Sequence, residues 1–146
     1  MEAKDLMIGD WVQIVPDAPV MPNEYHRIDW IRTGEIGLDN RKIVTYPYIH
    51  PIPLTPEILE KNGFTYSVSE SNGLCRTYIY GDKSNHVLAE VTLYDLPING
   101  CSCLIRIETD SQTCGGINKI HNCDLLYVHQ LQHALRLCQI EKEINL

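Results

Sequence analysis

Two histidines spaced four residues apart are the most suggestive chemical feature of the 146-residue sequence. His129 and His133 lie in the segment His-Gln-Leu-Gln-His, and on a helix their imidazoles would share one face. Zinc proteases use this spacing with a Glu after the first histidine as general base. Gln130 stands at that position, and an amide cannot take up a proton. A catalytic zinc protease is therefore excluded, and we assign no catalytic residue.

We interpret the histidine pair as part of a polar helix face, on which His and Gln side chains bond to nearby backbone or water. A metal ion held by His129, His133 and a third ligand is the less favoured alternative. No third ligand is obvious close to the pair in the sequence. We therefore expect no bound metal and no cofactor.

The six cysteines offer a second possible metal site. Cys101 and Cys103 alternate with isoleucines as one face of a buried strand does, and free Cys behaves there as a small apolar residue. No Cys-x-x-Cys pair occurs, so the commonest zinc and redox spacings are absent. A structural zinc is the weaker alternative, and a reactive thiol beside a histidine is another. The zinc ligands would be Cys114, His121 and Cys123 of the polar segment 110–123, and the reactive pair would be Cys123 with His121 or His129.

Aromatic residues of the first half could form a binding face, although such residues more often cover a small core. The candidate residues for binding a ligand or partner are these aromatic residues and three histidines: Trp11, Tyr25, Trp30, Tyr48, His121, His129 and His133.

Composition limits the classes of partner. The formal net charge is −7 and the pI is about 5.2, with no run of Lys or Arg, so we expect no nucleic-acid binding. No apolar stretch approaches the roughly 20 residues that span a membrane, and the first residues lack the apolar core of a signal peptide. We expect a cytoplasmic protein with reduced thiols.

Hydrophobic patterning predicts an α+β fold in two halves. In residues 1–54, short strands at 10–15 and 25–32 and two more between residues 33 and 46, with tight turns, favour a small β-barrel-like half. Residues 55–63 contain the signals of a short linking helix, from the cap at Thr55 to the stop at Gly63.

The remainder of residues 55–146 predicts a four-stranded antiparallel meander covered by a long C-terminal helix over residues 124–138. Apolar positions recur every three or four residues in that helix. Residues 141–146 alternate as a short final strand would.

Two blocks of the sequence resemble a family of small uncharacterised proteins from phages, prophages and mobile elements of Bacteroides-type gut bacteria. The first block runs from Leu6 to Val12 and continues at residues 51–64, and the second covers residues 127–135. The resemblance implies an accessory role for a phage or mobile element in the cytoplasm of its bacterial host. No established activity accompanies the family, so the resemblance assigns no catalytic residue.

The favoured function is a non-enzymatic module that binds a protein or a small ligand. Two alternatives come from other classes: a small metal-dependent hydrolase that uses His129 and His133, and a protein that sequesters a nucleotide signal of the host. The sequence favours a non-enzyme, and it leaves the oligomeric state open.

Limited proteolysis tests whether the two halves form one cooperative body. Residues 46–53 are rich in proline but also include Tyr48, Ile49 and Ile52, which a free tether does not need. Each half is near the size at which one core becomes marginal. We therefore expect resistance to proteases at residues 46–54. Rapid cleavage there into two stable fragments would show independent domains.

Overall fold

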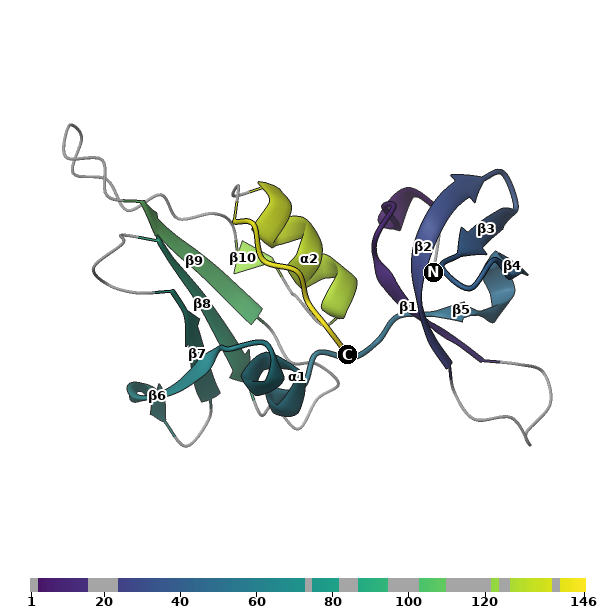
Figure 1. Cartoon of the computed structure of the whole chain (residues 1–146). Helices are drawn as coiled ribbons and strands as arrows, with labels where there is room; N and C mark the ends of the chain where they lie inside the picture. Colours follow the sequence, from purple (N-terminus) through teal and green to yellow (C-terminus); the bar gives the residue numbers. More distant parts are fainter. Residues whose placement is uncertain are drawn as a thin grey trace. The chain divides into compact units, whose positions relative to one another are not determined.

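The computed structural model describes residues 3–15, 24–72, 75–81, 87–94, 103–109, 122–123, 127–137 and 140–146 (Figure 1). The fold is α+β, as predicted, with its strands in two antiparallel sheets. The chain forms two compact units. Unit 1 comprises Met1–Pro53 and Tyr127–His133, and unit 2 comprises Leu54–Leu126 and Ala134–Leu146. Within the described ranges, no helix is both long enough and apolar enough to cross a membrane.

Unit 1 contains a five-stranded sheet in the order β4-β3-β2-β1-β5. Its strands are β1 (Trp11–Ile14), β2 (Glu24–Arg32), β3 (Glu35–Leu38), β4 (Ile43–Thr45) and β5 (Ile49–His50). The 3-10 helices η1 (Ala3–Asp5) and η2 (Tyr46–Tyr48) precede β1 and β5. The strands predicted in this half are confirmed. The proline-rich residues 46–53 contribute η2 and the additional strand β5.

The sheet of unit 1 is curved but not closed, so the prediction of a barrel is wrong as far as closure is concerned. β4 and β5 are its opposite edges, and in a flat sheet with strands about 4.8 Å apart they would be about 19 Å from each other. The η2 helix, which rises about 2 Å per residue, is much too short to bridge that distance. The sheet must therefore curl, and the register shift in β2 between Ile28 and Trp30 helps it to do so.

Aliphatic side chains from the N-terminal segment and four strands fill the concave side of this sheet. The cluster consists of Leu6, Val12, Ile28, Ile36, Leu38 and Ile49.

Outside this cluster, Trp30 pairs across the strands with Gly37, and a Cβ atom built at Gly37 would overlap the indole. The glycine thus gives the large ring a place to lie flat on the neighbouring strand.

Unit 2 begins with helix α1 (Pro56–Lys61), which confirms the predicted linking helix. Thr55 Oγ1 accepts a hydrogen bond from the Ile58 N–H, and Pro56 occupies the first turn. Gly63 has a φ of +80°, as expected of the left-handed residue after a helix. Local sequence alone therefore determines both ends of α1.

The sheet of unit 2 has five strands rather than the predicted four, in the order β10-β9-β8-β7-β6. The strands are β6 (Thr65–Asn72), β7 (Cys75–Tyr80), β8 (Val87–Tyr94), β9 (Cys103–Thr109) and β10 (Asn122–Cys123). The two-residue strand β10 is too short to show any alternation in sequence. Ala89, Val91 and Leu93 of β8 are fully buried, so alternate residues of this strand share a buried face. Apart from β10, the segment 110–123 lies outside the described residues.

The C-terminal helix is shorter than predicted, because α2 spans only the 10 residues Val128–Leu137. Tyr127 forms an isolated β-bridge with Pro53, and the Val128 N–H donates to the Ile52 carbonyl at 2.9 Å. The chain is therefore still extended at Tyr127, and residues 124–126, at the start of the predicted helix, lie outside the described residues. Val128, Leu131 and Leu135 are fully buried, as their spacing predicted.

The predicted final strand at residues 141–146 does not form. The side chain of Asn62 takes the place of a neighbouring strand, since its Oδ1 accepts from the Asn145 N–H and its Nδ2 donates to the Asn145 carbonyl, both at 2.8 Å. Asn62 is itself 2% exposed. One buried amide thus satisfies the backbone groups that would otherwise pair in a sheet.

The contact between Trp30 and Gly37 makes a testable prediction. Gly37→Ala should destabilise the protein by about 1–3 kcal/mol, because the indole has to move away from the new methyl group. Urea unfolding followed by circular dichroism measures this change. The same substitution in a Trp30→Ala background should cost much less, and equal costs in both backgrounds would contradict the proposed clash.

Candidate functional site

The first turns of α2 and the turn before β1 meet at a buried carboxylate within unit 1. Asp10 is fully buried, and its Oδ2 accepts from the Met7 N–H and from His133 Nε2, each at 2.7 Å. An ionised carboxylate can only accept, so in that form of the pair the donor is the Nε2–H of His133. The pair can work as an imidazole oriented by an acidic group, or as a purely structural contact.

Two glutamines of α2 fix the surrounding backbone. Gln132 Oε1 accepts from the Trp11 N–H at 3.1 Å, and its Nε2 donates to the Gly9 carbonyl at 3.2 Å. Gln130 Oε1 accepts from the Tyr127 N–H at 3.1 Å and so satisfies a backbone donor at the start of the helix. The interpretation of a polar helix face bonded to nearby backbone is therefore confirmed for Gln132.

His129 differs from His133 in its hydrogen bonding within the described residues. It is 3% exposed, and among the described residues its buried Nδ1 has no hydrogen-bond partner. Its ring lies nearly parallel to that of Tyr127, at 10° and 5.8 Å between centroids, and edge-on to His133 at 5.8 Å. Burial lowers the pKa of His129, and nearby His133 lowers it further, while Asp10 and Asp5 act in the opposite direction. The ring is therefore neutral at pH 7.

Tyr127, His129 and His133 border a pocket of about 460 Å³ that lies wholly within unit 1. Its lining consists of Asp5, Pro51, Tyr127, His129, Gln130 and His133. The volume suits a small organic molecule. The six residues come from η1, from the segment after β5 and from the start of α2, so three distant parts of the sequence form one concavity.

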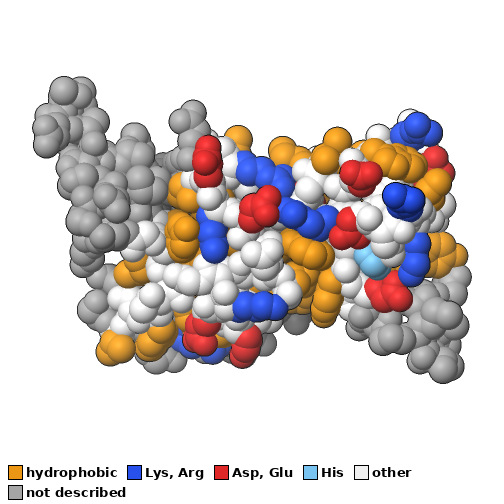
Figure 2. All heavy atoms as spheres, viewed as in Figure 1, with side chains coloured by type: hydrophobic (Ala, Val, Ile, Leu, Met, Phe, Trp, Pro, Cys, Tyr) orange, Lys and Arg blue, Asp and Glu red, His pale blue; other side chains and the backbone are white. Residues whose placement is uncertain are grey.

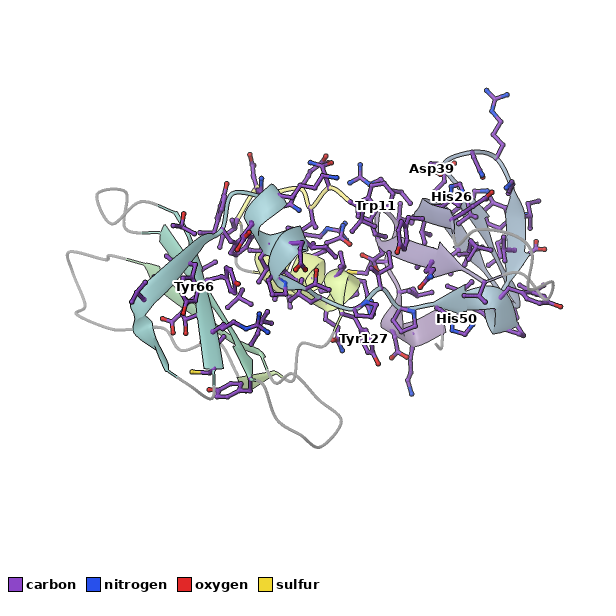
Figure 3. All side chains as sticks on the ribbon, turned by 90° about the horizontal axis from the view of Figure 1, so that it is seen from below. Trp11, His26, Asp39, His50, Tyr66 and Tyr127 are labelled. Atoms are coloured by element: carbon purple, nitrogen blue, oxygen red, sulfur yellow. The ribbon has the colours of Figure 1, made fainter. Side chains whose placement is uncertain are left out.

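A second polar cluster in unit 1 surrounds His26 on β2. Its Nδ1 lies 3.0 Å from Asp39 Oδ1 and its Nε2 lies 3.1 Å from Glu24 Oε2, which also accepts from Lys42 Nζ at 2.7 Å. Figure 3 shows His26 beside Asp39, well away from Tyr127. The contacts to Lys42 and His26 lower the pKa of Glu24. Because these groups satisfy one another, we interpret the cluster as a structural polar network at the surface of the sheet.

The residues of the predicted aromatic binding face have different neighbours in the structure. The Arg27 guanidinium lies 5.6 Å above the Trp11 ring, and that of Arg32 lies 4.8 Å above the Trp30 ring. Tyr25 is half exposed on β2, and Tyr48 belongs to η2, where its carbonyl accepts from the Val15 N–H. Of the predicted site residues, His129 and His133 are the two that line the pocket. His121 lies outside the described residues.

The partners of the histidine pair could not be identified from the sequence. In the sequence, Asp10 is recognisable only as a turn residue, and Asp5, Pro51 and Tyr127 give no indication of a function. The sequence gives one weak signal of these contacts. Gln132 and His133 follow His129 by three and four residues, so on a helix they share its face and are well placed to bond to nearby backbone. This spacing cannot show which of the 19 acidic residues forms a hydrogen bond with His133.

Charged side chains of both signs are mixed over the surface drawn in Figure 2. Among the described side chains on that face, Lys and Arg alternate with Asp and Glu and form no continuous basic patch. Within the described residues, no three His, Cys, Asp or Glu side chains are grouped so as to hold a metal ion. Cys114 and His121 are not among them, and neither is the side chain of Cys123.

Comparison of the chain with protein-family models, with curated proteins and with solved structures finds no match. Any function assigned to this chain therefore rests on the geometry of the site.

The lowered pKa of His129 predicts a loss of stability in acid. In the unfolded chain the imidazole takes up a proton near its ordinary pKa of about 6.5, whereas the folded protein resists protonation at that pH. Below about pH 6.5, the unfolding free energy should fall by up to about 1.4 kcal/mol per pH unit until the folded group also titrates.

The measurement is urea unfolding at several pH values between about 7 and 5. His129→Leu should remove this contribution, whereas His50→Leu, at an exposed histidine of β5, should keep the wild-type slope. Parallel curves for wild type and His129→Leu would show that His129 is not the acid-sensitive group.

Proposed function

We propose that this chain is a non-enzymatic binding module, and that its ligand is a small molecule held in the pocket at the start of α2. The observation on which the proposal rests is a buried histidine, 3% exposed and with an Nδ1 that has no partner among the described residues, in the wall of a 460 Å³ concavity. Proteins seldom leave such a polar atom unsatisfied unless the site has a use for it.

The lining favours binding over catalysis. Asp10 and His133 resemble an oriented general base, but the six lining residues include no Ser, Thr or Cys to act as nucleophile. The alternative of a metal-dependent hydrolase gains no support from the described residues, which hold no cluster of three metal-binding side chains. A preformed pocket bordered by polar groups and one aromatic ring is typical of ligand recognition.

A protein that sequesters a nucleotide signal is the second candidate. The concave, polar pocket that such a protein needs is present. Its lining, however, includes no Lys or Arg, the side chains that recognise phosphate groups best. The phage or mobile-element setting implied by the resemblance, and a cytoplasmic location in the bacterial host, form part of this proposal.

Ligand-observed NMR with a fragment library tests the proposed site. Gln130→Trp places a large ring in the pocket lining, while Leu137→Trp places the same ring at a helix position that is 76% exposed. Fragments should bind wild type and Leu137→Trp alike and lose at least about tenfold in affinity for Gln130→Trp, or about 1.4 kcal/mol.

Circular dichroism verifies that both variants are folded. Fragments that bind Gln130→Trp as tightly as wild type would place the ligand elsewhere. A library without any binder would contradict the proposed function itself.

A further inference from the structure

A small set of polar contacts holds the start of α2 within unit 1. The Val128 N–H donates to the Ile52 carbonyl at 2.9 Å, and His133 Nε2 lies 2.7 Å from the buried Asp10 carboxylate. Gln132 bonds to the backbone on either side of Asp10. None of these bonds belongs to the strand ladder of the sheet, so they can break while the sheet stays paired.

His129, which lies among these contacts, can accommodate a neutral ring but not a charged one. The residue is 3% exposed, and its Nδ1 has no hydrogen-bond partner among the described residues. A neutral imidazole can carry its proton on the other nitrogen and leave only a lone pair unbonded at Nδ1. An imidazolium carries an N–H on both nitrogens, so protonation creates a buried donor without an acceptor, which is unfavourable.

The position of His129 on the helix opposes a positive charge as well. His129 is the second residue of α2, and the first turn of this helix contains no acidic residue. Unbonded N–H groups make the beginning of a helix the positive end of its dipole, where a cation is unfavourable. The ring of His133 lies edge-on at 5.8 Å between centroids, so protonation of both rings would bring two positive charges close together.

Titratable groups face His129 from three segments of unit 1. They are Tyr127 and His133 of the α2 segment, Asp10 in the turn before β1, and Asp5 on η1. The segment after β5 contributes only the apolar residues 51–53. The two carboxylates favour a proton on His129, but burial of the ring has the larger effect and lowers its pKa. Detachment into water removes the effect of burial, so the detached form takes up a proton more readily.

We propose that the start of α2 is an acid-sensitive switch: a proton on His129 favours a form in which residues 127–133 lose their contacts with the turn before β1 while the sheet of unit 1 stays paired. Four of the six residues that line the pocket belong to this segment, so its detachment takes the pocket apart. Val128 and Leu131 are fully buried, which keeps the detached form a minor state at neutral pH. The inference rests on the proposed function for its effect on a ligand, and it adds regulation of the same site.

Amide hydrogen exchange of the full chain, followed by NMR, tests the detachment without a ligand. The Trp11 and Val128 N–H groups report on the junction, because their acceptors are Gln132 Oε1 and the Ile52 carbonyl. After correction for the intrinsic effect of pH on exchange, their protection factors should fall between about three- and 25-fold from about pH 7 to about pH 5. The upper figure follows from an ordinary histidine pKa of about 6.5 in the detached form. A fall smaller than about threefold would overturn the inference.

A low urea concentration separates local detachment from unfolding of the sheet. Local opening exposes little surface, so about 1 M urea should leave exchange of the Trp11 and Val128 amides nearly unchanged, whereas it should accelerate exchange of the β3 amides about fivefold or more. The junction amides should also be less protected than those of β3. Equal protection and equal urea dependence at both places would mean that acid acts only on global stability, and would overturn the inference.

Variants assign the pH effect to its source. His129→Leu and His129→Gln cannot take up the proton, so the protection of the Val128 amide should become independent of pH within about twofold. His50→Leu, at an exposed histidine on β5, should keep the wild-type change. The two replacements at His129 differ in polarity, and circular dichroism verifies that each is folded. A wild-type pH effect in a folded His129 variant would contradict the role given to this ring.

A fragment from the library connects the switch to the ligand. Because the ligand binds only the attached form, a fragment at about ten times its Kd should raise the protection of the Trp11 and Val128 amides about tenfold. A bound fragment that leaves their protection unchanged would overturn the inference and leave the proposed binding function in place. A library without any binder would contradict the proposed function, whereas the exchange experiment would still decide whether acid detaches the start of α2.

Discussion

The fully buried carboxylate of Asp10 is the group on which the arrangement of the site depends. A buried negative charge is costly unless donors surround it, and Asp10 receives them from the Met7 N–H and from His133. The first donor closes the turn before β1, and the second fixes a helix that lies 123 residues away in the chain. Gln132 reinforces the same junction through the backbone on either side of Asp10.

This junction gives different roles to two histidines that look equivalent in the sequence. His133 is hydrogen-bonded to Asp10, and this bond orients its ring. His129 lies one turn earlier, loses nearly all contact with water and finds no partner at Nδ1 among the described residues. The pocket opens beside this second ring. Helical spacing therefore creates the pair, whereas the position of one buried carboxylate decides which member is hydrogen-bonded to it.

Features that depend on nearby residues can be predicted well. The cap at Thr55, Pro56 and the left-handed Gly63 locate helix α1, because each of these acts within one or two turns of the chain. The alternation of β8 and the apolar spacing of α2 correctly identify buried residues. Features that depend on distant pairing escape such prediction, including β10, the start of α2 at Val128 and the role of Asn62 in place of a final strand.

The sequence by itself determined the α+β class, most strand positions, helix α1 and the pairing of two histidines on one helix face. Only the tertiary structure decided that the first sheet stays open, that α2 is short, and that Pro51, Tyr127 and His129 come together around a pocket. The physical reason is the range of the interactions. Caps and hydrophobic periodicity act over a few residues, whereas the burial of Asp10 and the desolvation of His129 depend on segments separated by as many as 123 residues.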